Sequence, residues 1–117
     1  MKAEKLLNRT RGKFVASRVK LCQSLLRRLV GLLGTQNLPE DEAYWLIPCN
    51  SVHTLGMKYP IDVYFLDKKN RVISEIKNLK PNRFSPLLWK AHSALEFKAG
   101  TLKNIFVGDE ISLEGPR

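Results

Sequence analysis

The chain has 117 residues, of which 44% are hydrophobic and 26% are charged, and its formal net charge is +9. This length suits one domain with one core, and the composition is ordinary for a soluble globular protein. No apolar run approaches the ~18 residues of a membrane span, and the polar, basic start lacks the apolar stretch of a secretory signal. We therefore expect a cytoplasmic protein without a transmembrane segment, whose cysteines are reduced.

The basic charge is concentrated in residues 1–33, which hold nine Lys or Arg and one acid, so that residues 34–117 sum to only +1. Such a block can attract nucleic acid, an anionic membrane or an acidic partner, or it can be a solvated face. Phe14 is the only aromatic residue in the block, which gives base stacking little support. The candidate surface-binding residues are Arg18, Lys20, Arg27 and Arg28.

The first third of the chain predicts an arm, a strand and a helix. Residues 1–12 are expected to be a loosely packed basic arm, and residues 13–117 a single globular domain. Lys13 to Leu21 alternates with the period of a half-buried strand, whereas Cys22 to Leu33 has a helical period and ends before Gly34, a natural C-cap. We expect this helix, at about 23–33, to cover a sheet.

The rest of the chain predicts strands joined by turns. Short strands are expected at 44–47, 61–66, 71–79, 94–97 and 110–114, with a hairpin turn in which Asn70 adopts a left-handed backbone. Asp109 is expected to cap local backbone groups, Trp89 to anchor its loop to the core, and one helical turn to end at Gly108. The predicted fold is α+β and mostly β: a compact antiparallel domain with one covering helix.

Three stretches resemble the DUF192 family of small bacterial and archaeal proteins. They are PCNSVHTLGMKYPIDVYFLD (48–67) with the RVISEI hairpin strand, the earlier LLRRLVGLLG, and the closing LEFKAGT and VGDEISL. The resemblance covers roughly residues 13–115. It implies a barrel-like domain, or one with strongly bent sheets, plus a helix, and it implies no agreed activity.

The loop from Cys49 to Asp62 concentrates the side chains that could carry chemistry. Cys49, His53 and Met57 have the spacing C-x3-H-x3-M, and thiolate, imidazole and thioether together suit copper, with His92 as the remaining candidate ligand. Alternatively, Cys49 is a catalytic nucleophile with His53 as its base. The plainest alternative is structural, with a buried Cys, a hydrogen-bonded His and a Met that fills the core.

A third interpretation makes this loop a polar ligand pocket next to Cys49. Donors, acceptors and stacking faces would come from Trp45, Asn50, His53, Thr54, Met57 and Asp62. In this hypothesis His53 or Thr54 satisfies the Asp62 carboxylate, and Met57 forms an apolar wall. The leading prediction is a non-catalytic binding or accessory domain for a small ligand or a protein, without a cofactor. Nucleic-acid or anionic-surface binding through residues 1–33 is second, and a copper or Cys-dependent enzyme site is third.

Overall fold

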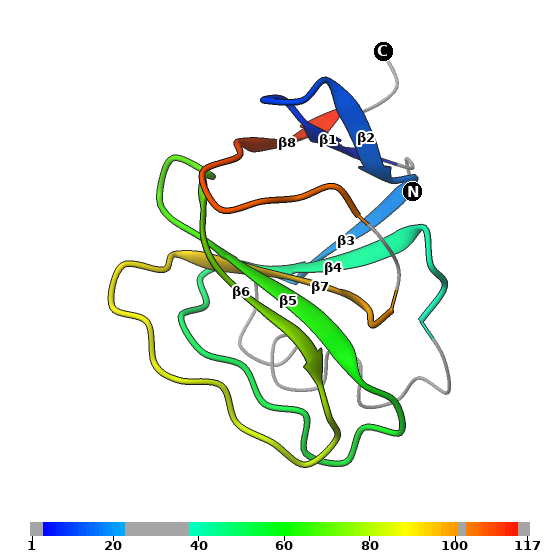
Figure 1. Cartoon of the computed structure of the whole chain (residues 1–117), viewed down its shortest axis with the longest axis vertical. Coiled ribbons are helices and arrows are strands. Elements are labelled where there is room, and N and C mark those ends of the chain that lie inside the picture. Colours follow the sequence, from blue (N-terminus) through cyan, green and yellow to red (C-terminus); the bar gives the residue numbers. More distant parts are fainter. Residues whose placement is uncertain (1–3, 23–37, 101–102, 115–117) are drawn as a thin grey trace.

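The computed structural model describes residues 4–22, 38–100 and 103–114, and these ranges contain eight β-strands and no helix (Figure 1). The strands are β1 (Lys5–Asn8), β2 (Lys13–Ala16), β3 (Arg18–Cys22), β4 (Glu42–Leu46), β5 (Ile61–Leu66), β6 (Val72–Leu79), β7 (Ser93–Lys98) and β8 (Ile111–Glu114). The mostly β prediction is confirmed. The helix expected at 23–33 lies outside the described residues, and Cys22 ends β3 instead of starting a helix. The described part of the chain thus offers no helix that could span a membrane.

The smaller sheet has the strand order β2-β1-β8, and both of its pairings are antiparallel. Its middle strand lies in the segment that we expected to be a loosely packed arm. That expectation is wrong for residues 5–8, because Leu6 and Asn8 are fully buried there. The short amphipathic run is ordered by pairing with the last strand of the chain, which no local pattern reveals.

Asp109 joins the segment at β1 to the segment that precedes β8. Its Oδ2 accepts hydrogen bonds from Asn8 Nδ2 at 2.8 Å, Arg11 Nε at 2.8 Å and the backbone N–H of Phe106 at 3.0 Å. Burial alone would raise the pKa of Asp109, but the hydrogen bonds from Arg11 and Asn8 outweigh it and hold that pKa below its ordinary value. The predicted local cap is confirmed, and it is also a long-range link.

The larger sheet has the order β3-β4-β7-β5-β6. β3 and β4 pair in parallel, so the expectation of an antiparallel domain is wrong at this edge. Parallel neighbours need a crossover of a dozen or more residues, and residues 23–41 supply that length. As the described residues form them, both sheets are open, so the barrel-like alternative is not observed.

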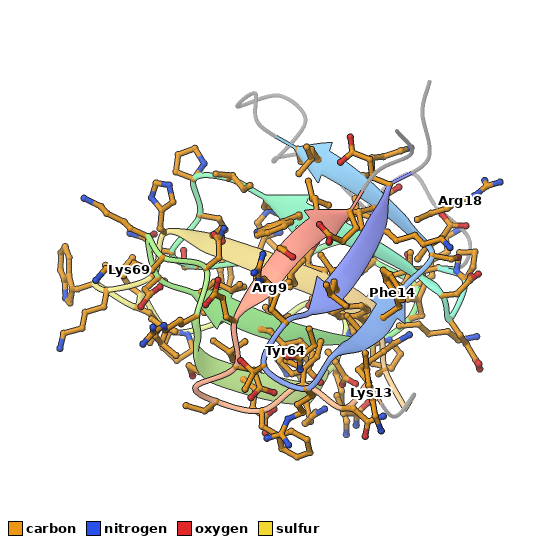
Figure 2. The ribbon with its side chains drawn as sticks, turned by 90° about the horizontal axis from the view of Figure 1, so that it is seen from above. Arg9, Lys13, Phe14, Arg18, Tyr64 and Lys69 are labelled. Atoms are coloured by element: carbon orange, nitrogen blue, oxygen red, sulfur yellow. The ribbon has the colours of Figure 1, made fainter. Side chains whose placement is uncertain are left out.

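The single strand expected at 13–21 is two strands in different sheets. Between them, the backbone N–H groups of Ser17 and Arg18 both donate to the carbonyl of Asp41, at 2.7 and 3.3 Å. This junction carries the chain from the smaller sheet into the larger one. Seen from above, the strands of the smaller sheet lie across those of the larger sheet (Figure 2).

The predicted hairpin is confirmed, since β5 and β6 pair antiparallel and Asn70 has a φ of 61°. Asp67 Oδ1 accepts hydrogen bonds from the backbone N–H groups of Lys69 and Arg71, which closes the turn. The helical turn expected to end at Gly108 is wrong for the described residues 103–108. Gly108 instead has a φ of 99° in a tight turn before β8, a conformation that favours glycine.

Both faces of the larger sheet are buried along its inner strands β4, β7 and β5. Along β5, Tyr64 and Leu66 pack into the cluster shared with the smaller sheet, while Ile61, Val63 and Phe65 pack into a second cluster. The second cluster includes residues from the loops at 48–60 and 80–92. A strand covered on both faces is expected to be apolar, and Asp62, which is also buried, is the charged exception on β5.

Candidate functional site

The segments 48–60 and 80–92 run beside each other and form what we call the paired loops (Figure 1). Backbone hydrogen bonds of 2.8–2.9 Å join Cys49 to His92, Asn50 to Leu88, Val52 to Ser85 and Thr54 to Arg83. An isolated bridge also joins His53 to Phe84. The segment from Cys49, which the sequence analysis singled out for its chemistry, is therefore hydrogen-bonded along its length to a second loop. That second loop lies more than 25 residues further along the chain.

Several predicted ligand residues have their polar groups satisfied inside the fold. Thr54 Oγ1 donates to the carbonyl of Lys80 at 2.6 Å and accepts from the N–H of Arg83 at 2.9 Å. Trp45 Nε1 donates to Ser93 Oγ at 2.9 Å. These bonds account for the buried Thr54 and Trp45 as structural groups.

Asp62 has a different partner from the one expected. Its Oδ1 accepts the backbone N–H of Asn78, on the neighbouring strand β6, at 2.7 Å. The hypothesis that His53 or Thr54 satisfies this carboxylate is wrong for Oδ1, because that oxygen accepts its bond from β6 and the Thr54 hydroxyl donates to Lys80. Met57 is buried in the second core cluster.

Cys49 shares a pocket with His92 rather than with His53. A pocket of about 230 Å³ is lined by Pro48, Cys49, Asn50, Ala91 and His92. The Cys49 thiol donates to the carbonyl of Ser51 at 3.0 Å. His53 lies further along the loop, where its Nδ1 accepts the N–H of Leu55 at 3.3 Å and its ring centroid is 6.2 Å from that of Phe84. Of the six predicted ligand residues, only Asn50 lines this pocket.

A ready-made metal centre is not found among the residues that the structure describes, where no three His, Cys, Asp or Glu side chains converge. The C-x3-H-x3-M spacing places its Met in the core and its His away from the Cys49 pocket. Of the predicted surface-binding residues, Arg18 and Lys20 are exposed, and Lys20 Nζ lies 5.5 Å from the Tyr44 ring centroid. Arg27 and Arg28 lie outside the described residues.

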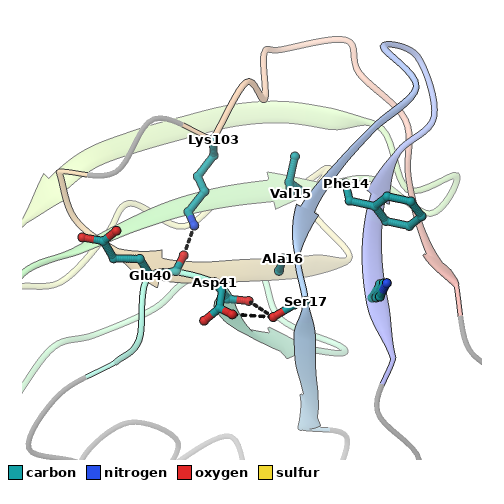
Figure 3. Close-up of a pocket in the computed structure, with 8 residues that line it drawn as sticks. Phe14, Val15, Ala16, Ser17, Glu40, Asp41 and Lys103 are labelled. Carbon is teal, nitrogen blue, oxygen red and sulfur yellow. Dashed lines mark hydrogen bonds between the residues drawn. The ribbon is translucent and has the colours of Figure 1, made fainter.

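A larger groove lies where the smaller sheet meets the segment before β4 (Figure 3). Its volume is about 420 Å³, within the range of small-molecule sites. The lining residues are Lys5, Phe14, Val15, Ala16, Ser17, Glu40, Asp41 and Lys103. The groove thus combines apolar side chains with polar groups of both charges, and Lys5 lies beside Phe14, with its Nζ 5.4 Å from the centroid of the ring.

Lys103 is the buried cation of this groove. Its ammonium donates to the backbone carbonyl of Glu40 and lies 5.1 Å from the centroid of the Phe97 ring. Burial lowers the pKa of Lys103, and the carboxylates of Glu40 and Asp41 offset this only in part. Among the described residues Lys103 forms no ion pair, so its direct contacts are a carbonyl and a ring face, while the carboxylates of Glu40 and Asp41 act on its charge from further away.

The groove was missed from the sequence because its parts are far apart in the chain. Asp41 accepts the Ser17 hydroxyl at 2.6 Å, which lowers the pKa of Asp41, and Lys103 reaches the same place from beyond β7. No motif joins these positions. The one available signal in the sequence was the density of acidic residues at 40–42.

Glu96 is another buried ionisable group. It lies on β7 between Tyr44 of β4 and Val63 of β5, in the interior of the larger sheet. Burial raises the pKa of Glu96 to about 8. The carboxyl group is therefore largely protonated at neutral pH, where it is neutral and can donate a hydrogen bond.

Comparisons with known proteins agree with this architecture. The profile of the DUF192 family, described as "Uncharacterized ACR", matches residues 6–113. A "UPF0127 protein" of Thermococcus sibiricus is 32% identical over 116 residues, covering 93% of this chain and 74% of the relative. A "UPF0127 protein" of Pyrococcus furiosus is 29% identical over 113 residues, covering 91% of this chain and 95% of the relative.

Two solved structures share the fold. A protein of unknown function from Novosphingobium aromaticivorans superposes with a TM-score of 0.78 at 18% identity, covering 94% of this chain and 83% of that chain. A chain from Sinorhizobium meliloti, named a "putative transcription regulator", superposes with a TM-score of 0.77 at 20% identity, covering 97% of this chain and 92% of that chain. At these identities the likeness concerns the fold alone.

Proposed function

The chain belongs to the DUF192 family, whose function is unknown, and within that frame we propose that it is a small non-catalytic binding domain. We place its ligand in the groove over Lys103 and assign the ligand an anionic group and an apolar body. The observation that carries this proposal is the buried ammonium of Lys103, which lines an open groove without an ion-pair partner among the described residues.

A buried ammonium favours an anion that enters the groove. Removing an ammonium from water costs free energy, and a carbonyl, a ring face and the more distant carboxylates of Glu40 and Asp41 compensate less than a directly bonded anion does. A carboxylate near Lys103 would therefore gain a charge-assisted hydrogen bond in partly desolvated surroundings. Its apolar body would lie against Val15 and Ala16 of β2, whereas the Phe14 ring points away from Lys103 (Figure 3).

This site is tested with N-acetyl-leucine, a carboxylate with an aliphatic body, followed by amide NMR shifts. We expect shifts at residues 14–17 and 40–41, and at least tenfold weaker binding by Lys103→Met, which keeps the apolar stem but removes the charge. Lys68→Met, a change in the exposed hairpin, should bind within about twofold of wild type, because a distant surface charge is screened. Equal binding by Lys103→Met and wild type would exclude the proposed site.

The Cys49 pocket supports a second candidate function, the binding of a soft metal ion or a small polar ligand. Its support is the 2.8 Å hydrogen bond from the N–H of Cys49 to the carbonyl of His92, which holds a thiol and an imidazole at one pocket. Cu(I) added anaerobically should bind wild type more tightly than Cys49→Ser or His92→Ala, because thiolate and imidazole suit this ion. Equal, weak uptake by all three proteins would rule the metal out.

A further inference from the structure

The paired loops carry most of the large hydrophobic side chains that the described part of the chain exposes. Four of the seven are Leu55 (41% exposed), Phe84 (71%), Leu87 (49%) and Trp89 (84%). The others, Phe14, Phe106 and Val107, lie on different segments. Single exposed apolar residues are normal, but four on one loop pair indicate an interaction surface.

Trp89 is not needed to hold its loop in place. We expected this side chain to anchor the loop to the core, and that expectation is wrong, because Leu88 packs against the second core cluster and Trp89 is exposed. Backbone hydrogen bonds from Leu88 to Asn50 and from Ala91 to Leu88 fix the turn. The tryptophan is thus presented to the outside by a loop that other residues stabilise.

The charge of the paired loops is of one sign. They contain the basic residues Lys58, Lys80, Arg83 and Lys90 and no acidic residue. Elsewhere in the described chain, Arg9 and Arg11 meet carboxylates of Glu110 and Asp109. A loop pair with aromatic, aliphatic and basic side chains but no acid is complementary to an anionic, partly apolar surface.

We propose that the paired loops dock on an anionic lipid bilayer. Trp and Phe favour the interfacial region of a membrane, leucine side chains gain from the acyl boundary, and Lys and Arg interact with anionic headgroups. The two leucines favour lipid over single-stranded nucleic acid, because base stacking uses aromatic or guanidinium planes. This surface is separate from the groove over Lys103, and either proposal can fail without the other.

The native tryptophans supply the readout. Trp45 is 3% exposed and Trp89 is 84% exposed, so a change of emission on vesicle binding reports mainly on Trp89. With phosphatidylcholine vesicles containing about one-third phosphatidylserine, we expect a blue shift, quenching by brominated acyl chains and loss of binding at high salt. Vesicles of phosphatidylcholine alone should bind much more weakly.

Matched variants locate the surface by vesicle co-sedimentation. Lys80→Gln with Lys90→Gln should weaken binding about 25-fold, at roughly fivefold per charge, whereas Lys13→Gln with Lys20→Gln removes equal charge elsewhere and should have little effect. Phe84→Ser with Trp89→Ser should abolish binding, and Phe106→Ser with Val107→Ser should not. Phe84, Phe106 and Lys20 make ring contacts with His53, Arg11 and Tyr44 respectively, so thermal unfolding serves as the check that each variant folds.

Three results would overturn the proposal. One is the absence of vesicle binding by the wild type at low salt. Another is an equal loss of binding in the two charge variants, which would move the surface to the N-terminal basic residues. The third is binding of a single-stranded oligonucleotide, lost in Phe84→Ser with Trp89→Ser, by a protein that does not bind vesicles.

Discussion

Glu96 shows how one buried carboxyl group couples the stability of this fold to pH. Its ordinary pKa of 4.5 applies in the unfolded chain, and burial raises the value to about 8 in the folded one. Between these values the unfolded state gives up the proton while the folded state keeps it. The contribution is therefore fully present below pH 4.5 and is lost as the pH rises toward 8.

We expect Glu96→Gln to stabilise the protein at neutral pH. The amide has nearly the shape of the protonated acid but does not ionise, so the gain should be of order 3 kcal/mol at pH 7 and small at pH 5. Urea unfolding at both pH values measures it, with the exposed Glu75→Gln as control. A stability difference from wild type that is independent of pH would show that Glu96 does not keep its proton.

At the scale of elements, the paired loops act as a unit because their backbone groups bond to each other. Thr54 lies at the centre of this arrangement, since its hydroxyl serves a carbonyl and an N–H of the opposite loop. Its side chain was a predicted ligand group. In the structure, the two hydrogen bonds of its hydroxyl connect one of the paired loops to the other. These loops carry the Cys49 pocket and the exposed aromatic residues.

Replacing Thr54 by Val should lower the free energy of unfolding by about 2–3 kcal/mol, because the carbonyl of Lys80 and the N–H of Arg83 lose their partner. Thr54→Ser keeps the hydroxyl and should lose about 1 kcal/mol or less. Chemical denaturation of both variants compares the two. If Ser and Val are equally destabilising, the methyl group rather than the hydroxyl matters.

For the whole molecule, the core between the two sheets depends on the N-terminal strand. β1 is the middle strand of the smaller sheet, and Leu6 is fully buried in the cluster that both sheets share. If residues 1–12 were an arm outside the domain, as the sequence predicted, the shared core cluster would lack Leu6 and be exposed on the side of the smaller sheet. β1 and β8 together therefore complete the fold.

Leu6→Ala should therefore cost about 2–4 kcal/mol of stability, as large-to-small changes in a packed core do. Leu7→Ala, at a half-buried position on the same strand, is the matched control and should cost about 1 kcal/mol. Thermal unfolding monitored by circular dichroism measures both. Equal, small effects would mean that the N-terminal strand contributes little to the core.

The sequence by itself determined the features that depend on neighbouring residues. Local patterns located β4, β5, β6, β7 and β8, and the turn residues around Asn70 placed the hairpin, because side-chain period and backbone preference are local properties. The family resemblance was likewise carried by short sequence motifs that occur in a fixed order along the chain. The chemistry-rich segment from Cys49 was also visible, although what its side chains meet was not.

Only the tertiary structure decided which distant residues meet. It paired Cys49 with His92 instead of His53, satisfied Asp62 from β6, and brought Lys103 to Glu40 and Asp41. It also buried Glu96, exposed Trp89 and drew residues 5–8 into a sheet. These outcomes depend on strand order and on the parallel crossover to β4, which the periodicity of a single chain does not encode, since the same alternating strand can pair with several neighbours.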